Sequence, residues 1–141
     1  MSTSVRAELV GVGTELLLGQ IANTNAKWMG ERLAEIGVDV LYHQVVGDNA
    51  GRIADVLRLA CSRADAVLVT GGLGPTEDDI TRDVLADLLG SRMVRVPELE
   101  TYLRDRFAGF GSGDMPANNL RQADVPEGAR FIMPERGTAP G

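Results

Sequence analysis

Three short apolar runs, each followed by a turn that contains glycine, constrain the fold of this chain more than any other feature. They cover residues 7–13, 38–48 and 65–72, and they are rich in valine and leucine. The second run is rich in β-branched and aromatic residues, and the third is almost wholly apolar, as is typical of strands that are covered on both faces of a parallel sheet. We therefore expect these runs to be strands of one mainly parallel sheet.

Helical patterns alternate with these runs. Residues 25–37 carry apolar side chains at helical spacing from Ala26 to Ile36, and Gly37 is placed to end the helix. Similar patterns begin at residue 49 and cover residues 77–89. Strands that alternate with helices predict an α/β fold, here a three-layer sandwich built on a mainly parallel sheet.

The second half of the chain predicts shorter elements. We expect a short strand at 93–96, a helix that begins at Pro97, a mobile loop at 109–116, a short helix at 117–126 and a strand at 129–134. The sequence has no internal repeat and no stretch with the composition of a linker. A length of 141 residues suits a single domain.

The charge and the rare residue types exclude several classes of function. The chain has 14 lysine and arginine residues against 20 aspartate and glutamate residues, a net charge of −6, which argues against binding to nucleic acid or to an anionic membrane. The single Cys61 lies in a predicted helix and is expected to be a buried thiol, and the single His43 excludes a site built from several histidines. Because no apolar run reaches the roughly 20 residues of a membrane span and the start lacks a secretory signal, we expect a cytoplasmic protein.

The loop after the third run presents a chemical conflict. Three glycines within residues 71–74 allow backbone N–H groups to approach an anion such as phosphate, but the three acids at 77–79 should repel it. The loop matches neither the Walker motif nor the dinucleotide fingerprint. In a structural interpretation the glycines form a tight turn and the acids complement the dipole of the next helix, with Thr76 and Asp79 as a capping box. In a functional interpretation, Asp78 or Asp79 holds a divalent cation that bridges to phosphate.

Carboxylates also follow the other two strands. Glu15 comes after the first strand and Asp48 after the second. Simpler interpretations are a turn residue in solvent for Glu15 and a helix cap for Asp48. Residues 23–25, Asn-Thr-Asn, supply more capping groups than one helix needs, which suggests a further polar contact to a ribose or a phosphate. Because the carboxyl ends of parallel strands meet at one edge of a sheet, we expect the three loops to converge on one site.

Two further segments carry polar candidates. Residues 136–141 are interpreted as a loop with one cation, or as a disordered tail. Asn119 and Arg121 are candidates for polar contacts, although a solvated helix face is the preferred interpretation.

Five segments together resemble a known family. They are GTELLLGQIANTN, VVGDN, TGGLGPTEDDITRD, NNLRQADVPEGA and GTAPG, and they follow the family's order over nearly the whole chain. The chain closely resembles the amino-terminal domain of the CinA family of competence- and damage-inducible proteins, a branch of the MoaB/MogA molybdopterin-binding fold. The adjacent Asp78 and Asp79, where many MogA-like loops have Arg-Asp, favour the CinA branch.

The resemblance implies an ADP-ribose pyrophosphatase, which depends on magnesium, manganese or cobalt, is assisted by potassium, and yields AMP and ribose 5-phosphate. It assigns catalysis to Asp79 and Asp78, and metal binding to Asp78, Asp79 and Glu15. The residues expected to bind the nucleotide are Gly13, Thr14, Glu15, Asn25, Asp48, Gly71, Gly72, Gly74, Thr76 and Thr81. A metal-activated water is expected to attack the pyrophosphate, with Asp79 or Asp78 as ligand or as base.

Two other functions are open on the same residues. One is a protein of molybdenum cofactor biosynthesis that binds or adenylylates molybdopterin. The other is a module that binds a nucleotide or a pterin without turnover. Relatives in this superfamily form dimers or trimers, so the resemblance also implies a homo-oligomer.

The resemblance bears on the extent of the chain as well. Many CinA proteins carry a carboxy-terminal domain with nicotinamide-mononucleotide deamidase activity, and nothing in this sequence corresponds to it. The family's first domain continues past the GTAPG segment through a further strand. We therefore expect residues 1–141 to form one CinA-type domain that is truncated at its carboxy terminus.

Overall fold

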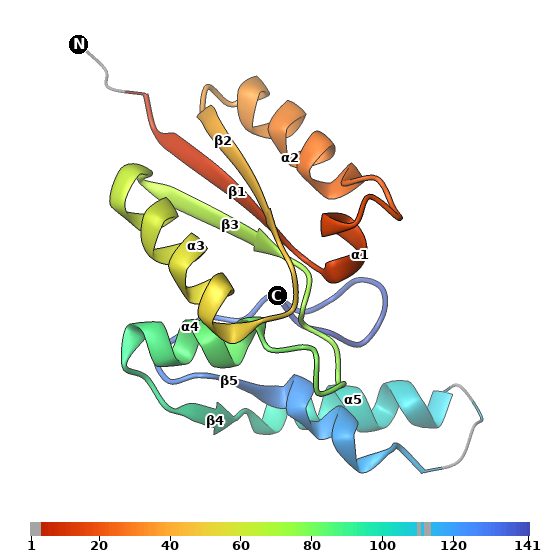
Figure 1. The fold of residues 1–141 in the computed structure, drawn as a ribbon. Coiled ribbons are helices and arrows are strands. Elements are labelled where there is room, and N and C mark those ends of the chain that lie inside the picture. The colour runs from red at the N-terminus through yellow and green to blue at the C-terminus, as the bar shows by residue number, and fades with distance from the viewer. Residues whose placement is uncertain (1–3, 110, 112–113) are drawn as a thin grey trace. The chain divides into compact units, whose positions relative to one another are not determined.

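The computed structural model describes residues 4–109, 111 and 114–141, so the mobile loop expected at 109–116 lies partly outside the described residues. The chain divides into two compact units, the first within Met1–Gly71 and the second within Gly72–Gly141. Figure 1 shows the order of the elements along both. The expectation of a single domain stays a prediction.

A parallel sheet is the centre of the first unit. It contains β1 (Arg6–Val12), β2 (Asp39–Val46) and β3 (Ala66–Thr70), in the order β2-β1-β3. Both neighbours pair with β1 in parallel, so that Leu9 lies opposite His43 on one side and opposite Leu68 on the other. The three apolar runs are therefore the strands that their composition predicts.

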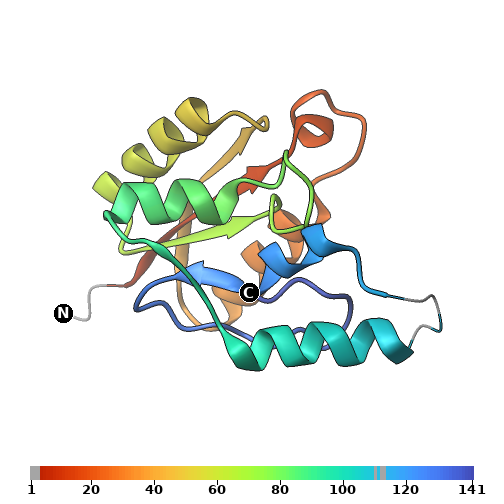
Figure 2. The same ribbon diagram turned by 90° about the horizontal axis from the view of Figure 1, so that it is seen from below.

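Helices cover both faces of this sheet. Gly30 of α2 (Thr24–Glu35) lies close to His43, since a Cβ atom there would stand 3.9 Å from His43 Nε2. Arg63 at the end of α3 (Ala50–Arg63) contacts Glu8 instead. Because Glu8 pairs with the neighbour of His43 in β2, and successive side chains point to opposite faces, the two helices lie on opposite sides. The first unit is thus the three-layer α/β arrangement that the sequence predicts, as Figure 2 shows.

The apolar core of the first unit lies mainly between the sheet and α3. Ile53, Leu57 and Ala60 of α3 are fully buried, at the helical spacing that their sequence shows. Cys61 is exposed, because it follows Ala60 and points away from that stripe, so the expectation of a buried thiol is wrong. Ile36 is also exposed (73%), because α2 ends before it and Gly37 takes the left-handed conformation expected of a helix end.

A bidentate ion pair fixes the amino-terminal end of the sheet. Arg6 donates from Nη2 to Asp65 Oδ1 at 3.0 Å and from Nε to Oδ2 at 3.1 Å, and its backbone N–H donates to Oδ2 at 2.9 Å. The side-chain bonds, followed by the backbone bond, lower the pKa of Asp65 from its usual 3.8 to about 2.

We expect an NMR titration of Asp65 to give a pKa of about 2. Because the folded pKa is below the unfolded one, the pair stabilises the fold above about pH 4, and this contribution is lost as the pH falls through about 2. Arg6→Gln removes the side-chain donors and should return the pKa toward 3.8. Arg58→Gln, which changes an exposed arginine of α3, should leave it unchanged; an equal rise in both variants would contradict the assignment.

The second unit has a different organisation. Its elements are α4 (Thr81–Leu89), β4 (Met93–Arg95), α5 (Pro97–Gly109), the 3-10 helix η1 (Ala117–Ala123) and β5 (Asp124–Pro126). The strands β4 and β5 pair antiparallel. A small core of Leu99, Leu103, Ala123 and Val125 joins α5, η1 and β5, with Phe131 packed against it.

Three expected elements of the second unit differ from the structure. The short helix expected at 117–126 ends at Ala123, and the three residues after it form β5. The helix expected at 77–89 begins only at Thr81, because the Thr81 N–H bonds to Gly72 O at 3.2 Å and the preceding residues form a separate turn. The strand expected at 129–134 is absent from the described residues, where β5 at Asp124–Pro126 pairs with β4 instead. The apolar pattern there reflects the packing of Phe131 on the core rather than a strand.

Among the residues that the structure describes, no helix is long and apolar enough to cross a membrane.

Candidate functional site

The carboxyl ends of the three strands meet at one edge of the first unit. The N–H of Gly13 donates to Val46 O at 2.9 Å, and Thr14 donates to Asp48 Oδ2 from its backbone N–H at 3.1 Å and from Oγ1 at 2.9 Å. Asp48 thus links the loop after β2 to α1 (Thr14–Leu17) and does not cap α3. Asn49 caps α3 by accepting from the Arg52 N–H at 3.0 Å.

The other polar candidates of this edge are open to solvent. Glu15 is exposed on α1, and its carboxylate folds over Gly13, since a Cβ atom there would stand 2.8 Å from Glu15 Oε1. Asn23 caps α2 by accepting from the Ala26 N–H at 3.1 Å. Asn25 lies in the first turn of α2 with an exposed side chain.

Gly71 follows β3 and packs directly on β1. Its φ of 91° is left-handed, and a Cβ atom there would stand 2.0 Å from Val12 O, a backbone atom that cannot move aside freely. The loops after β1 and β2 and the start of the loop after β3 therefore come together in the first unit. Their convergence with the later residues of that loop stays a prediction.

We expect Gly71→Ala to destabilise the protein by more than the about 1–2 kcal/mol that left-handed backbone alone costs an L-residue. Gly19→Ala is the matched control, because Gly19 has a φ of 69° but open space around the position of its Cβ atom. Urea denaturation of the two variants measures the difference. Equal losses of stability would contradict the close contact between Gly71 and Val12.

The glycine-rich loop continues in the second unit. Gly72 has a φ of 68°, and a Cβ atom there would stand 2.2 Å from Thr81 Oγ1. Thr81 is buried at the start of α4. The backbone of Gly72 thus lies directly against Thr81, an approach that requires glycine.

Residues 76–79, here called the acidic turn, hold the predicted catalytic carboxylate. Asp79 Oδ2 accepts from the Thr76 N–H at 3.0 Å and from Thr76 Oγ1 at 2.6 Å, and the Asp79 N–H donates to Thr76 O at 3.1 Å. Gly74 lies so close that a Cβ atom on it would stand 2.5 Å from Asp79 Oδ2. Burial acts to raise the pKa of Asp79, but the bonds from Thr76 and Gly74 hold it below its usual value.

This geometry corrects the interpretation of the three acids. They precede α4 rather than forming its first turn, so they do not follow one another around a helix. The expected Thr76–Asp79 pair exists, but it closes a turn instead of capping a helix. Asp78 lies at the exposed corner of that turn.

The acids of the turn are the predicted ligands of a hard divalent cation. In the described part of the chain, no group of three or more histidine, cysteine, aspartate or glutamate side chains lies close enough together to hold a metal. Magnesium and similar ions, however, often bind through one or two carboxylates together with substrate phosphates, so the carboxylates of Asp78 and Asp79 would be enough protein ligands. The bonds from Thr76 and Gly74 occupy three of the roughly four lone-pair sites of the Asp79 carboxylate and leave about one for a cation. The role of Glu15 as a ligand stays a prediction.

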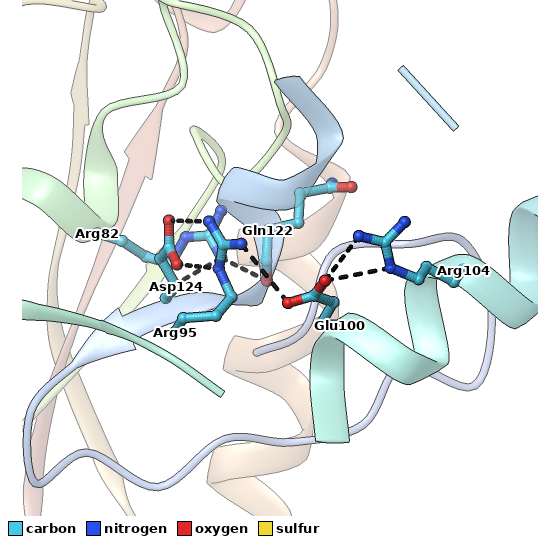
Figure 3. A network of polar contacts seen from close by, with 6 residues as sticks. All are labelled: Arg82, Arg95, Glu100, Arg104, Gln122 and Asp124. Carbon is cyan, nitrogen blue, oxygen red and sulfur yellow. Dashed lines mark hydrogen bonds and ion pairs between the residues drawn. The ribbon is translucent and has the colours of Figure 1, made fainter. Parts of the chain in front are cut away.

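Two arginines hold the glycine-rich loop. Arg82 donates from Nη2 to Leu73 O at 3.1 Å and from Nη1 to Gln122 O and Asp124 O at 3.0 and 3.3 Å, as Figure 3 shows for the last two. Burial lowers the pKa of Arg82. Arg121 donates from Nη1 to Thr76 O at 2.6 Å. A small pocket of about 30 Å³ lies among Asp79, Arg82, Asp83, Met93, Arg121 and Asp124.

Nothing in the sequence pattern singles out Arg82. For Arg121 the pattern allows a polar contact but favours a solvated helix face, and that preference is wrong. Arg121 instead contacts the acidic turn, 45 residues earlier in the chain. The available signal was the position of Arg121 beside two asparagines in a segment with few other charges, which is a weak one.

The last residues of the chain are tied to the second unit. The hydroxyl of Tyr102 on α5 lies 3.2 Å from Pro134 O and 3.3 Å from Gly137 O. Ile132 and Gly141 exchange backbone hydrogen bonds of 2.6 and 2.9 Å. The segment is therefore a closed loop and not a free tail.

Comparison with known proteins identifies the family. A family model described as "Probable molybdopterin binding domain" matches residues 8–140. The crystal structure of CinA from Thermoplasma acidophilum, described as a protein with unknown function, is similar over 99% of this chain and 81% of that chain, with a TM-score of 0.89 and 33% identity. The chain belongs to the CinA branch of this family.

Other comparisons agree with this CinA assignment. The chain is 54% identical over 135 residues to a protein of Symbiobacterium thermophilum named for competence and damage induction, and 50% identical over 141 residues to a CinA-like protein of Frankia casuarinae. The matches cover 96% and 97% of this chain but 32% and 33% of the relatives, so the chain spans about a third of their length. The molybdopterin biosynthesis enzyme MoaB of Thermus thermophilus is similar over 82% of this chain and 70% of that chain, with a TM-score of 0.56 and 28% identity. The predicted MoaB/MogA-like α/β fold is confirmed.

Proposed function

We propose that this CinA-type domain hydrolyses ADP-ribose to AMP and ribose 5-phosphate with the help of a divalent cation. The observation that carries the proposal is the acidic turn, where Thr76 fixes the Asp79 carboxylate close to the backbone of Gly74. A fixed carboxylate that can hold a cation, in a glycine-rich loop, suits the binding of a pyrophosphate through the cation.

The two aspartates take different roles in this proposal. Asp79 is oriented by donors from Thr76, which stabilise its anionic form and make it a weak base, so it suits the binding of a cation. Asp78 is exposed at the corner of the same turn, where it can accept a proton from water. A magnesium, manganese or cobalt ion would neutralise the charge of the pyrophosphate oxygens.

The reaction consumes one water and no other reactant. A water oxygen forms a bond to one phosphorus atom, and the bond between that phosphorus and the bridging oxygen breaks. One proton of the water passes to Asp78 and then to solvent, and the bridging oxygen leaves on the other phosphate. The products are AMP and ribose 5-phosphate in equal amounts.

The first unit carries polar side chains whose chemistry suits a ribose hydroxyl. Thr14 and Asp48 are already joined by hydrogen bonds, which orient both side chains for a ribose hydroxyl. Glu15 and Asn25 are exposed and can make further polar contacts. These four residues belong to the set that the family resemblance assigns to substrate binding.

The test is the release of AMP from ADP-ribose, followed by chromatography. The protein is incubated with magnesium, manganese or cobalt, each with potassium or with sodium, and with EDTA as the control. We expect equal amounts of AMP and ribose 5-phosphate with a cation, none with EDTA, and a higher rate with potassium. A folded protein that releases no AMP under any of these conditions would overturn the proposal.

A second candidate function is the binding or adenylylation of molybdopterin, which the description of the matching family model favours. Calorimetric titration with molybdopterin and with ADP-ribose in parallel separates the two. Saturation by molybdopterin without any response to ADP-ribose would support the second candidate. Binding of ADP-ribose without AMP release would instead indicate a module that binds without turnover.

A further inference from the structure

A guanidinium group from outside the acidic turn contacts both of its ends. Arg121 on η1 donates from Nη1 to Thr76 O at 2.6 Å and from Nη2 to Asp79 O at 3.3 Å. The same Nη2 lies 3.0 Å from Asp83 Oδ2 in the first turn of α4. One side chain therefore joins both ends of the acidic turn to the helix that follows it.

The position of the Asp79 carboxylate depends on whatever holds the acidic turn. The hydrogen bonds of this carboxylate run to Thr76 and Gly74, which belong to the same loop. These bonds fix the carboxylate relative to the turn. The position of the carboxylate in the second unit therefore depends on contacts from outside the loop, such as those of Arg121.

Arg82, the other arginine described above that contacts the glycine-rich loop, binds a different part of it. The partners of Arg82 are Leu73, at the start of the loop, and the backbone of Gln122 and Asp124. Those bonds tie the base of the loop to η1 and β5. Arg121 instead reaches the acidic turn itself, and with a side chain that is 37% exposed it is not needed to fill the core.

We propose that Arg121 is a positioning residue that fixes the acidic turn and, through it, the carboxylate of Asp79. Its two carbonyl contacts set the orientation of the turn, and its positive charge offsets the repulsion among the three neighbouring acids. The link to catalysis rests on the proposed function, because it requires Asp79 to act on ADP-ribose. The link to the geometry of the turn does not.

The first test measures the turn directly by amide hydrogen exchange. In Arg121→Gln, the amides of Thr76 and Asp79 should exchange about ten-fold faster or more, because the contacts that hold the turn closed are lost. Amides of α5 should be unchanged. Arg92→Gln is the matched control, since Arg92 is an exposed arginine of the same unit that pairs with Glu127. Unchanged exchange in the acidic turn of Arg121→Gln would overturn the proposal.

The second test measures catalysis. Arg121→Gln should lower kcat for ADP-ribose by about 10–100-fold with less than about a three-fold change in KM, because a displaced carboxylate mainly affects the transition state. Arg121→Lys should give an intermediate kcat, since an ammonium group restores the charge but not the fork of donors. A wild-type kcat in a folded Arg121→Gln variant would also overturn the proposal.

The two proposals fail in different ways. If the wild-type protein releases no AMP, the proposed function fails, and the exchange comparison alone decides the role of Arg121. If circular dichroism shows that Arg121→Gln does not fold, Arg121→Lys replaces it in both tests. Arg92→Lys then replaces Arg92→Gln as the control.

Discussion

Asp79→Asn should reduce the release of AMP from ADP-ribose by about 10²–10⁴-fold while the protein stays folded. Asparagine has nearly the same shape and keeps one side-chain oxygen, which can still accept from the N–H and the hydroxyl of Thr76. What is lost is the negative charge that a cation requires. The measurement is the initial rate of AMP formation at saturating metal, with thermal unfolding of the variant as the test of folding.

The control for this prediction is Asp87→Asn, which changes an exposed aspartate of α4 in the same unit. We expect Asp87→Asn to keep the wild-type rate within about two-fold, because substitutions at exposed sites have small effects. The rate of AMP formation in Asp78→Asn should lie between the rates in Asp79→Asn and Asp87→Asn if Asp78 accepts a proton that solvent can also accept. Retention of most of the activity in Asp79→Asn, with the same metal dependence, would sink the assignment of Asp79.

Glu8→Ala should reduce the free energy of unfolding by about 1–3 kcal/mol, the usual loss when a hydrogen-bonded partner is removed, because the side chain of Arg63 is 28% exposed and water can solvate it. Glu8 lies in the middle of β1 with no exposed surface. It accepts from Arg63 Nε and Nη2, both at 2.8 Å, and from Gln44 Nε2. The guanidinium of Arg63 also lies over the ring of Tyr42, 3.5 Å from its centre. Urea denaturation measures the loss.

Two matched variants identify the cause of that loss. Asp55→Ala removes one partner of an exposed pair on α3, that with Arg58, and should change stability by less than about 1 kcal/mol. The double change of Glu8 and Arg63 to methionine should recover much of the loss, because neither charge is then left without a partner. A double variant as unstable as Glu8→Ala would show that packing, not charge, accounts for the effect.

The same pair has a defined dependence on pH. The hydrogen bonds from Arg63, against the opposing effect of burial, lower the pKa of Glu8 below its usual 4.5. Because the folded pKa is the lower one, the stabilisation is complete above about pH 4.5 and is lost as the pH falls through the folded value. In Glu8→Ala, the free energy of unfolding should therefore depend less on pH below about pH 4.5 than in the wild-type protein.

The fold was predictable where local sequence carries the information. The strand β3 is apolar apart from its last residue, β1 and β2 are rich in valine and leucine, and the helix α5 begins at a proline that suits a first turn. These signals lie within each element and need no knowledge of distant residues. The same holds for the glycine-rich loop, which the sequence placed correctly after β3.

The errors arose where contacts between distant residues decide the outcome. The bond from Thr81 to Gly72 shortens α4 at its start, and the sequence around Thr76 reads equally well as a helix cap. Glu8 lies within an apolar run, and its partner Arg63 is 55 residues away. The role of Arg121 likewise depends on a bond across 45 residues. Side-chain pairs of this kind leave no periodic trace in a single sequence.

The irregular pairing of β1 and β2 has a consequence for how the sheet finds its alignment. Ala7 pairs with Val40 but Glu8 pairs with Tyr42, so Leu41 is an extra residue, a bulge that brings Tyr42 and Gln44 to the side of Glu8. A slip of one residue would turn every side chain of β1 to the opposite face and take the carboxylate away from its guanidinium. The shifted sheet would then hold the buried Glu8 carboxylate without a partner, which would destabilise it strongly. The ion pair and the bulge together favour this one register of β1 and β2 over registers shifted by a residue.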